Sequence, residues 1–303
     1  MSRALRNLSL LTTAAMFLVV LMGAWVTNTG SADGCGAHWP LCHGTFMPDW
    51  DYEAIVEFSH RVVAGIAGLM TTILFLWVWR KLPKRRDLFW AALTGLAFVV
   101  WQGALGALAV LWPQPKAVLA LHFGFSVMCF AGVLMVSILL YRPLGELRDL
   151  TVSPALRRWI WTVIGYTYVV MYLGAYVRHQ DAALACTGWP LCNDQLLPPL
   201  TGPVGVNFIH RVGAALSVVI VIRLWSMTRA ASRGLRLGGN LALLLVLLQV
   251  VSGALFPLGY YNLLTQMLHT SLITAFWGVL SYLALQIWPI RQPTQVQLPE
   301  ASA

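Results

Sequence analysis

The chain has 303 residues, of which 58% are hydrophobic and only 10% are charged, and its mean hydropathy is +0.71. Soluble domains carry about 25% charged residues, so an ordinary soluble fold is excluded and we expect an all-α integral membrane protein. The net charge of +9 does not indicate nucleic-acid binding, because the basic residues lie in short segments without the aromatic side chains that stack on bases.

Eight apolar runs reach the roughly 20 residues that a helix needs to cross a bilayer. The first follows Arg3 and Arg6 as a signal peptide would, but it exceeds the roughly 7–15 apolar residues of such peptides, so we interpret it as a retained helix. Eight spans divide evenly, which predicts two tandem, pseudo-symmetric four-helix bundles. In chain order the runs cover residues 9–29, 56–79, 88–111, 117–141, 157–178, 204–228, 238–257 and 262–288.

The basic residues predict the orientation. If the N-terminus is cytoplasmic, 16 of the 20 Lys and Arg residues fall in cytoplasmic segments, as the positive-inside rule requires. Both termini are then cytoplasmic, and the loops at about 30–55 and 179–203 lie outside the cytoplasm. A bacterial plasma membrane is the simplest location for such a protein.

Four of the five cysteines lie in these two outer loops. Cys35 and Cys42 enclose six residues, Cys186 and Cys192 enclose five, and both segments end in Trp-Pro-Leu-Cys. In an oxidising compartment each pair is most simply a structural disulfide. A redox-active dithiol, with thiol exchange in the first pair, is the alternative, although neither pair has the C-x-x-C spacing that lowers a thiol pKa.

The second half of the chain repeats the first. His60 follows Cys42 by 18 residues, and His210 follows Cys192 by the same 18. Because four crossings return the chain to its starting side, the two halves form a parallel repeat about an axis along the membrane normal. We place the halves at 1–148 and 149–303. Further matches, at offsets of 147 to 151, pair Gly23 with Gly174, Gln102 with Gln249, Gly106 with Gly253, and His122 with His269.

Four histidines are expected within the membrane, toward its outer side: His60 and His122 in the first half, His210 and His269 in the second. Ionisable groups are costly there and mark function by default. Two imidazoles from facing helices suit a haem iron, whose porphyrin supplies the other four nitrogens. Zinc or copper is less suitable, because each half offers only two histidines and no thiolate at that depth.

One position breaks the symmetry of the repeat. Glu57 lies three residues before His60 and shares its helix face, whereas the matching residue of the second half is Asn207. We infer that the first site performs chemistry and the second holds a cofactor; a first-turn acid favoured by the helix dipole is the alternative. Arg61 and Arg211, directly after the histidines, are candidates for binding haem propionates or for ordinary interfacial side chains.

Together these motifs resemble the haem A synthase family of bacteria and mitochondria, over nearly the whole chain. The resemblance implies an oxidoreductase that converts the ring methyl of haem O to the formyl group of haem A by two successive hydroxylations, for cytochrome oxidase assembly. It implies that His60 and His122 flank the substrate haem O and that His210 and His269 ligate the iron of a haem b cofactor. Glu57 would assist oxidation at the methyl carbon, and haem b would pass electrons away.

The partners that we expect are haem O, the enzyme that produces it, an electron acceptor and membrane lipid, and a homo-oligomer is compatible with the sequence. The main alternative is a di-haem b-type electron-transfer cytochrome or quinone oxidoreductase, which needs the four histidines but not Glu57. A membrane thiol oxidant would use the outer cysteine pairs instead. A transporter is a weaker alternative, because Gly/Pro breaks do not interrupt the helices at mid-membrane.

Overall fold

The computed structural model describes residues 2–46, 50–147, 149 and 151–288, and across these ranges the chain is helical apart from loops and two isolated β-bridges. Eight of the described helices are long and apolar enough to cross a membrane, which confirms the prediction of an all-α integral membrane protein. They are α1 (Arg3–Thr29), α2 (Tyr52–Lys81), α3 (Arg86–Leu111), α4 (Lys116–Tyr141), α6 (Pro154–His179), α7 (Gly202–Thr228), α8 (Arg233–Ala254) and α9 (Leu263–Gln286).

Each predicted run coincides with one of these helices, and the differences lie at the ends. Helix α1 begins earlier than its apolar run because the Ser2 side chain accepts the Leu5 N–H and caps it. Helix α8 ends at Ala254, three residues before Pro257, since a residue before proline avoids the helical region and proline has no N–H to donate. Two short helices, η1 (Ser31–Asp33) and α5 (Leu144–Leu147), were not predicted because they are too short to carry a periodic pattern.

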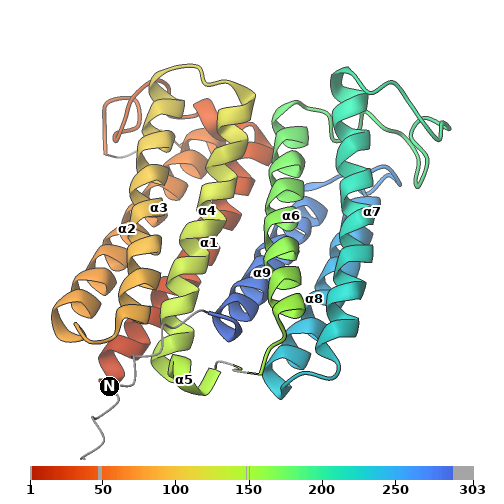
Figure 1. The fold of residues 1–303 in the computed structure, drawn as a ribbon. Coiled ribbons are helices and arrows are strands. Elements are labelled where there is room, and N and C mark those ends of the chain that lie inside the picture. The colour runs from red at the N-terminus through yellow and green to blue at the C-terminus, as the bar shows by residue number, and fades with distance from the viewer. Residues whose placement is uncertain (1, 47–49, 148, 150, 289–303) are drawn as a thin grey trace, which may run out of the picture.

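The helices of each half contact one another in chain order and close on themselves. Helix α1 contacts α2 and α4, and α3 contacts α2 and α4; likewise α6 contacts α7 and α9, and α8 contacts α7 and α9. The two groups stand side by side, joined through α4 with α6, α1 with α9, and α4 with α9 (Figure 1). The division of the chain at residues 148 and 149 stays a prediction, and residue 148 lies outside the described residues.

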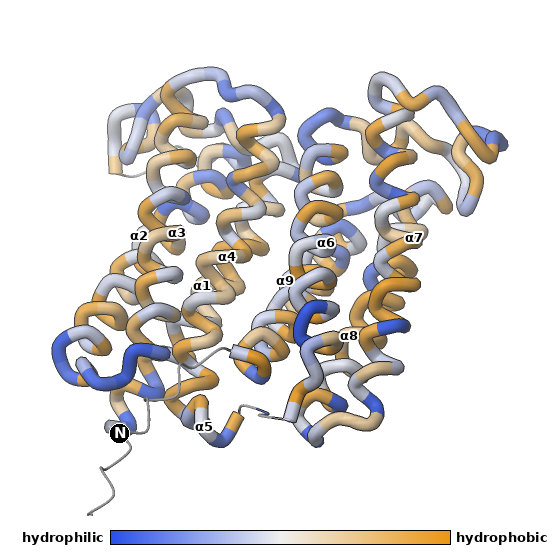
Figure 2. Tube along the Cα trace, in the orientation of Figure 1, coloured by the Kyte–Doolittle hydropathy of each residue, from blue (hydrophilic) through white to orange (hydrophobic). Residues whose placement is uncertain are grey.

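Both cysteine loops lie at one end of the helices, and the N-terminus and α5 lie at the other (Figure 1). Apolar residues follow the middles of the helices, whereas hydrophilic residues gather toward the two ends (Figure 2). This distribution fits a bilayer-spanning protein. The predicted cytoplasmic C-terminus falls in residues 289–303, outside the described residues.

Hydrogen bonds join the two halves at both ends. At the end with the cysteine loops, Arg178 of α6 donates from Nε to the Asn28 side-chain oxygen and from its terminal nitrogen to the Thr27 carbonyl, each at 2.6 Å. At the opposite end, the Asp149 N–H donates to the Gln286 carbonyl at 3.1 Å. These bonds hold α6 against α1 and the connecting segment against α9.

Helices α3 and α4 approach each other closely at Gly95 and Gly132. A Cβ atom on Gly132 would lie 2.5 Å from the Gly95 backbone nitrogen, and small residues permit such backbone contact in membranes. We expect Gly132→Ala to destabilise the protein by about 1–3 kcal/mol, the usual cost of overpacking. Thermal unfolding in detergent, followed by circular dichroism, tests this. Gly103→Ala is the control, because a Cβ there meets no atom within 4 Å; equal unfolding temperatures would contradict the prediction.

Candidate active site

The two histidines of the first half come from facing helices. His60 lies in α2 and His122 in α4, and the Nδ1 atom of each ring is buried. Each ring packs against a glycine of the preceding helix: a Cβ on Gly23 would lie 3.3 Å from Cε1 of His60, and one on Gly106 would lie 3.6 Å from Cε1 of His122. The glycines therefore leave room for both rings beside the backbone.

The second half repeats this arrangement with closer contacts. His210 lies in α7 and His269 in α9. A Cβ on Gly174 would lie only 2.8 Å from Cε1 of His210, and one on Gly253 would lie 3.1 Å from Cε1 of His269. Each of the four predicted haem-ligating rings thus packs against a glycine, and the ring–glycine contacts are closer in the second half.

The ring nitrogens differ in their partners. Among the described residues, the buried Nδ1 atoms of His60, His122 and His210 make no hydrogen bond. By contrast, His269 has a partner at each nitrogen: the Gln249 amide nitrogen lies 2.9 Å from Nε2, and the Ser252 hydroxyl lies 2.8 Å from Nδ1. Among the described residues, His269 is therefore the only one of the four rings with a hydrogen-bond partner at both nitrogens.

Glu57 is buried, with 4% of its surface exposed, and it links α2 to the first cysteine loop. One carboxylate oxygen accepts the Cys35 backbone N–H at 2.7 Å, and the other accepts hydrogen bonds from Nε and a terminal nitrogen of Arg61. Both oxygens thus have a donor. The carboxylate next to His60 is held in place by a backbone group on one side and a cation on the other.

Asn207 occupies the matching position but bonds with the opposite polarity. Its side-chain nitrogen donates to the carbonyl oxygens of Ala182 and Ala183, at 2.6 and 3.0 Å. Both side chains therefore anchor the segment that follows the preceding helix. Glu57 does so as a charged acceptor and Asn207 as a neutral donor, so only the first site contains a fixed negative charge.

The two arginines hold the cysteine loops in the same way. The terminal nitrogen Nη1 of Arg61 donates to the carbonyls of His38 and Leu41, and that of Arg211 donates to the carbonyls of Gly188 and Leu191. Arg211 also donates to the Cys186 carbonyl, at 2.6 Å. Because a guanidinium has five N–H donors, the bonds within the described residues leave one N–H of Arg61 and two of Arg211 for another acceptor.

The outer loops are closed by disulfides, as the sequence predicts. Cys35 bonds to Cys42 and Cys186 to Cys192, with Cα–Cα distances of 4.4 and 4.7 Å, within the range of ordinary disulfides. All four cysteines are buried. The remaining cysteine, Cys129, is buried between α4 and α3, where its thiol donates to the Gly95 carbonyl at 3.3 Å.

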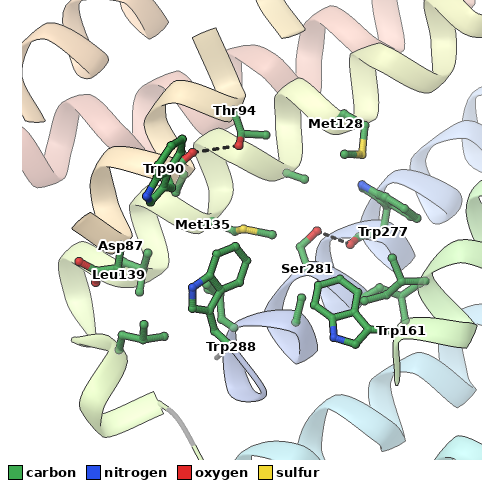
Figure 3. A pocket seen from close by; sticks show the side chains of 17 residues that line it. Asp87, Trp90, Thr94, Met128, Met135, Leu139, Trp161, Trp277, Ser281 and Trp288 are labelled. Carbon is green, nitrogen blue, oxygen red and sulfur yellow. Dashed lines mark hydrogen bonds between the residues drawn. The ribbon is translucent and has the colours of Figure 1, made fainter. Parts of the chain in front are cut away.

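A cavity of about 220 Å³ lies away from these groups, between the two halves. Figure 3 shows its walls, which carry Trp90, Trp161, Trp277 and Trp288 with methionine and leucine side chains. It is overwhelmingly apolar and includes the start of α3 and the end of α4, opposite the cysteine loops. Its lining contains no histidine, so it is separate from the candidate site.

Comparison with known proteins decides the family. A family model described as "Cytochrome oxidase assembly protein" matches residues 49–281. The chain belongs to this family. Among its relatives, a protein of Symbiobacterium thermophilum is 57% identical over 300 residues, which cover 96% of this chain and 98% of the relative. A protein of Geobacillus kaustophilus is 41% identical over 294 residues, covering 94% of this chain and 92% of the relative. Each of the two is named "Heme A synthase".

The family match covers Glu57 and the four histidines predicted to ligate haem. Two features of the site were not predicted from the sequence: the hydrogen bond of Ser252 to His269, and the packing of four glycines against the rings. The repeated Gln-x-x-x-Gly pattern in α3 and α8 was the available signal, since it places a glutamine and a glycine one turn apart on the helix face toward the next histidine.

Proposed function

We propose that the protein is a haem A synthase, which oxidises the ring methyl of haem O by two successive hydroxylations to the formyl group of haem A. The observation that carries this proposal is the end-to-end match, at 57% identity, with a relative of that name. A di-haem electron-transfer cytochrome and a thiol oxidant find no support among the relatives. The two histidine pairs provide the imidazole ligands that two haem irons would need.

We place the substrate in the first half, between His60 and His122. The buried Nδ1 atoms of both rings lack protein partners among the described residues. In this half a carboxylate, Glu57, lies three residues before the first of the paired histidines, where the second half has Asn207. The less crowded contacts at Gly23 and Gly106 suit a site whose occupant must enter and leave.

We place a resident haem b in the second half, with His210 and His269 as iron ligands. The residues fit this group: two imidazoles come from facing helices, each lies against a glycine whose Cβ would come within 3.1 Å of the ring, and the buried Nδ1 of His210 has no partner within the described residues. When bound, a haem b supplies one-electron redox chemistry. Arg211 keeps two N–H groups with which to bind a propionate, and Arg61 keeps one for the substrate.

Glu57 is the residue that we propose to act on the reaction. Its carboxylate is fixed from two sides and buried, and a preorganised charge in a water-poor site stabilises opposite charge that develops during a reaction. Oxidation at a methyl carbon develops positive charge there. Glu57 would thus favour the transition state without reorganising.

The experiment that tests the function is coexpression with a haem O-producing enzyme in a host that makes no haem A. Mass spectrometry of the extracted haems should show haem A, or hydroxylated haem O, with the wild type. The His122→Ala variant should lose this product, because it removes a substrate ligand. Two b haems without any oxidised haem O would indicate an electron-transfer cytochrome, and haem A formation that survives His122→Ala would contradict the placement of the substrate at His122.

A further inference from the structure

The matched helices α3 and α8 contact their histidines differently. In α8, Gln249 and Ser252 both reach the ring of His269, at 2.9 and 2.8 Å. In α3, the Gln102 side chain instead donates to the backbone carbonyl of His122, at 2.6 Å. The residue that matches Ser252 at the offset of 147 is Leu105, which has no polar atom to offer.

The direction of the Ser252 hydrogen bonds follows from its other partner. Its hydroxyl donates to the Gln249 backbone carbonyl at 2.9 Å, which uses its one hydrogen. The oxygen is then left to accept a hydrogen from Nδ1 of His269. A hydrogen on Nδ1 leaves the lone pair of the neutral ring on Nε2, and in this structure the Gln249 amide points at that atom.

Such a hydrogen bond is what orients a metal-binding histidine. A ligand imidazole ordinarily donates its second N–H to an acceptor, which fixes the tautomer and the ring orientation and raises the basicity of the ligand. His269 has this support, and its ring is further packed against Gly253 and the edge of Phe256, whose centroid lies 5.3 Å away. His122 has no acceptor at Nδ1 within the described residues.

We propose that Ser252 is a positioning residue that makes His269 a permanent haem ligand, and that Leu105 leaves His122 an exchangeable one. The inference rests on the proposed ligation of haem by these histidines. A cofactor site gains from a fixed ligand. A substrate site must release its product, so the same support at His122 would slow turnover.

The test compares three variants of the full-length protein: Ser252→Ala, Ser252→Leu and Ser252→Thr. We expect the first two to weaken haem b binding by about 10- to 100-fold, the usual effect of losing such a partner, and Ser252→Thr to restore binding because it keeps the hydroxyl. The readouts are the b-type absorbance retained on dilution in detergent and the reduction midpoint potential. The potential should rise in Ser252→Ala, because a less basic imidazole stabilises ferric iron less.

Ser226→Ala is the matched control, since Ser226 also donates to a carbonyl three residues earlier, that of Arg223, but lies far along α7 from the histidines. The reciprocal variant Leu105→Ser should increase the fraction of product haem that copurifies. Wild-type binding and potential in Ser252→Ala and Ser252→Leu would overturn the role of Ser252, and unchanged product retention in Leu105→Ser would overturn that of Leu105. If His269→Ala retained haem b, the proposed ligation itself would fail instead.

Discussion

Glu57→Ala should lower haem A formation by about 10²- to 10³-fold, the range seen when one preorganised electrostatic group is removed from an active site. The second half should keep its haem b, because the hydrogen bonds of Glu57 within the described residues go to Cys35 and Arg61 of the first half. The measurement is the ratio of haem A to haem O extracted from cells that make haem O, together with the b-type absorbance of the purified variant.

Glu57→Gln separates charge from anchoring. The glutamine oxygen can still accept the Cys35 N–H, so the loop stays attached to α2, but the negative charge is gone. If charge is what matters, Glu57→Gln should be as inactive as Glu57→Ala. Near-normal haem A formation by Glu57→Gln would show that the carboxylate only holds the loop. Asn207→Ala is the matched control, since it removes the equivalent anchor from the second half.

Gly174→Ala should deprive the second half of most of its haem b. The added Cβ would lie 2.8 Å from Cε1 of His210, closer than carbon atoms approach, and the ring cannot retreat without leaving its position. An iron ligand must be held to a fraction of an ångström. We expect at least a tenfold lower haem content per protein, measured by absorbance against protein concentration, with membrane insertion unchanged.

Two other glycine-to-alanine variants serve as controls for Gly174→Ala. Gly165→Ala lies on the same helix, where a Cβ meets no atom within 4 Å, and should leave the haem content unchanged. Gly106→Ala would bring a Cβ 3.6 Å from His122, an ordinary contact, and should be tolerated. Equal haem content in Gly174→Ala and Gly165→Ala would contradict a role for the glycine in seating His210.

Much of the fold follows from the sequence because the bilayer imposes it. A span of about 20 apolar residues has few alternatives to a helix, so the eight runs located all eight long helices. The disulfides were equally accessible, since each cysteine pair is separated by a short loop. The helix ends at Arg3 and Ala254 were displaced, because capping by Ser2 and the turn around Pro257 act locally and not through hydropathy.

The partners of the site residues were beyond the reach of sequence reasoning. The repeat identified Glu57 as the departure from symmetry, but not that its carboxylate bonds to Cys35 and Arg61. Bonds of this kind depend on how a loop folds back onto a helix, which has no periodic signature. Ser252 was overlooked for a related reason: a serine inside an apolar helix gains meaning only when the facing helix brings His269 within reach.

The helix contacts between the two halves follow the symmetry of the repeat. Helices α1 and α6 occupy equivalent places in the repeat, as do α4 and α9. The contact of α1 with α9 is therefore equivalent to the contact of α6 with α4, and α4 contacts its own counterpart, α9. This is the pattern of an isologous dimer, here joined in one chain. In a homodimer every substitution appears in both subunits at once. Pairs as unlike as Glu57 with Asn207, or Leu105 with Ser252, therefore require that the two units are encoded separately, so that each is free to change alone.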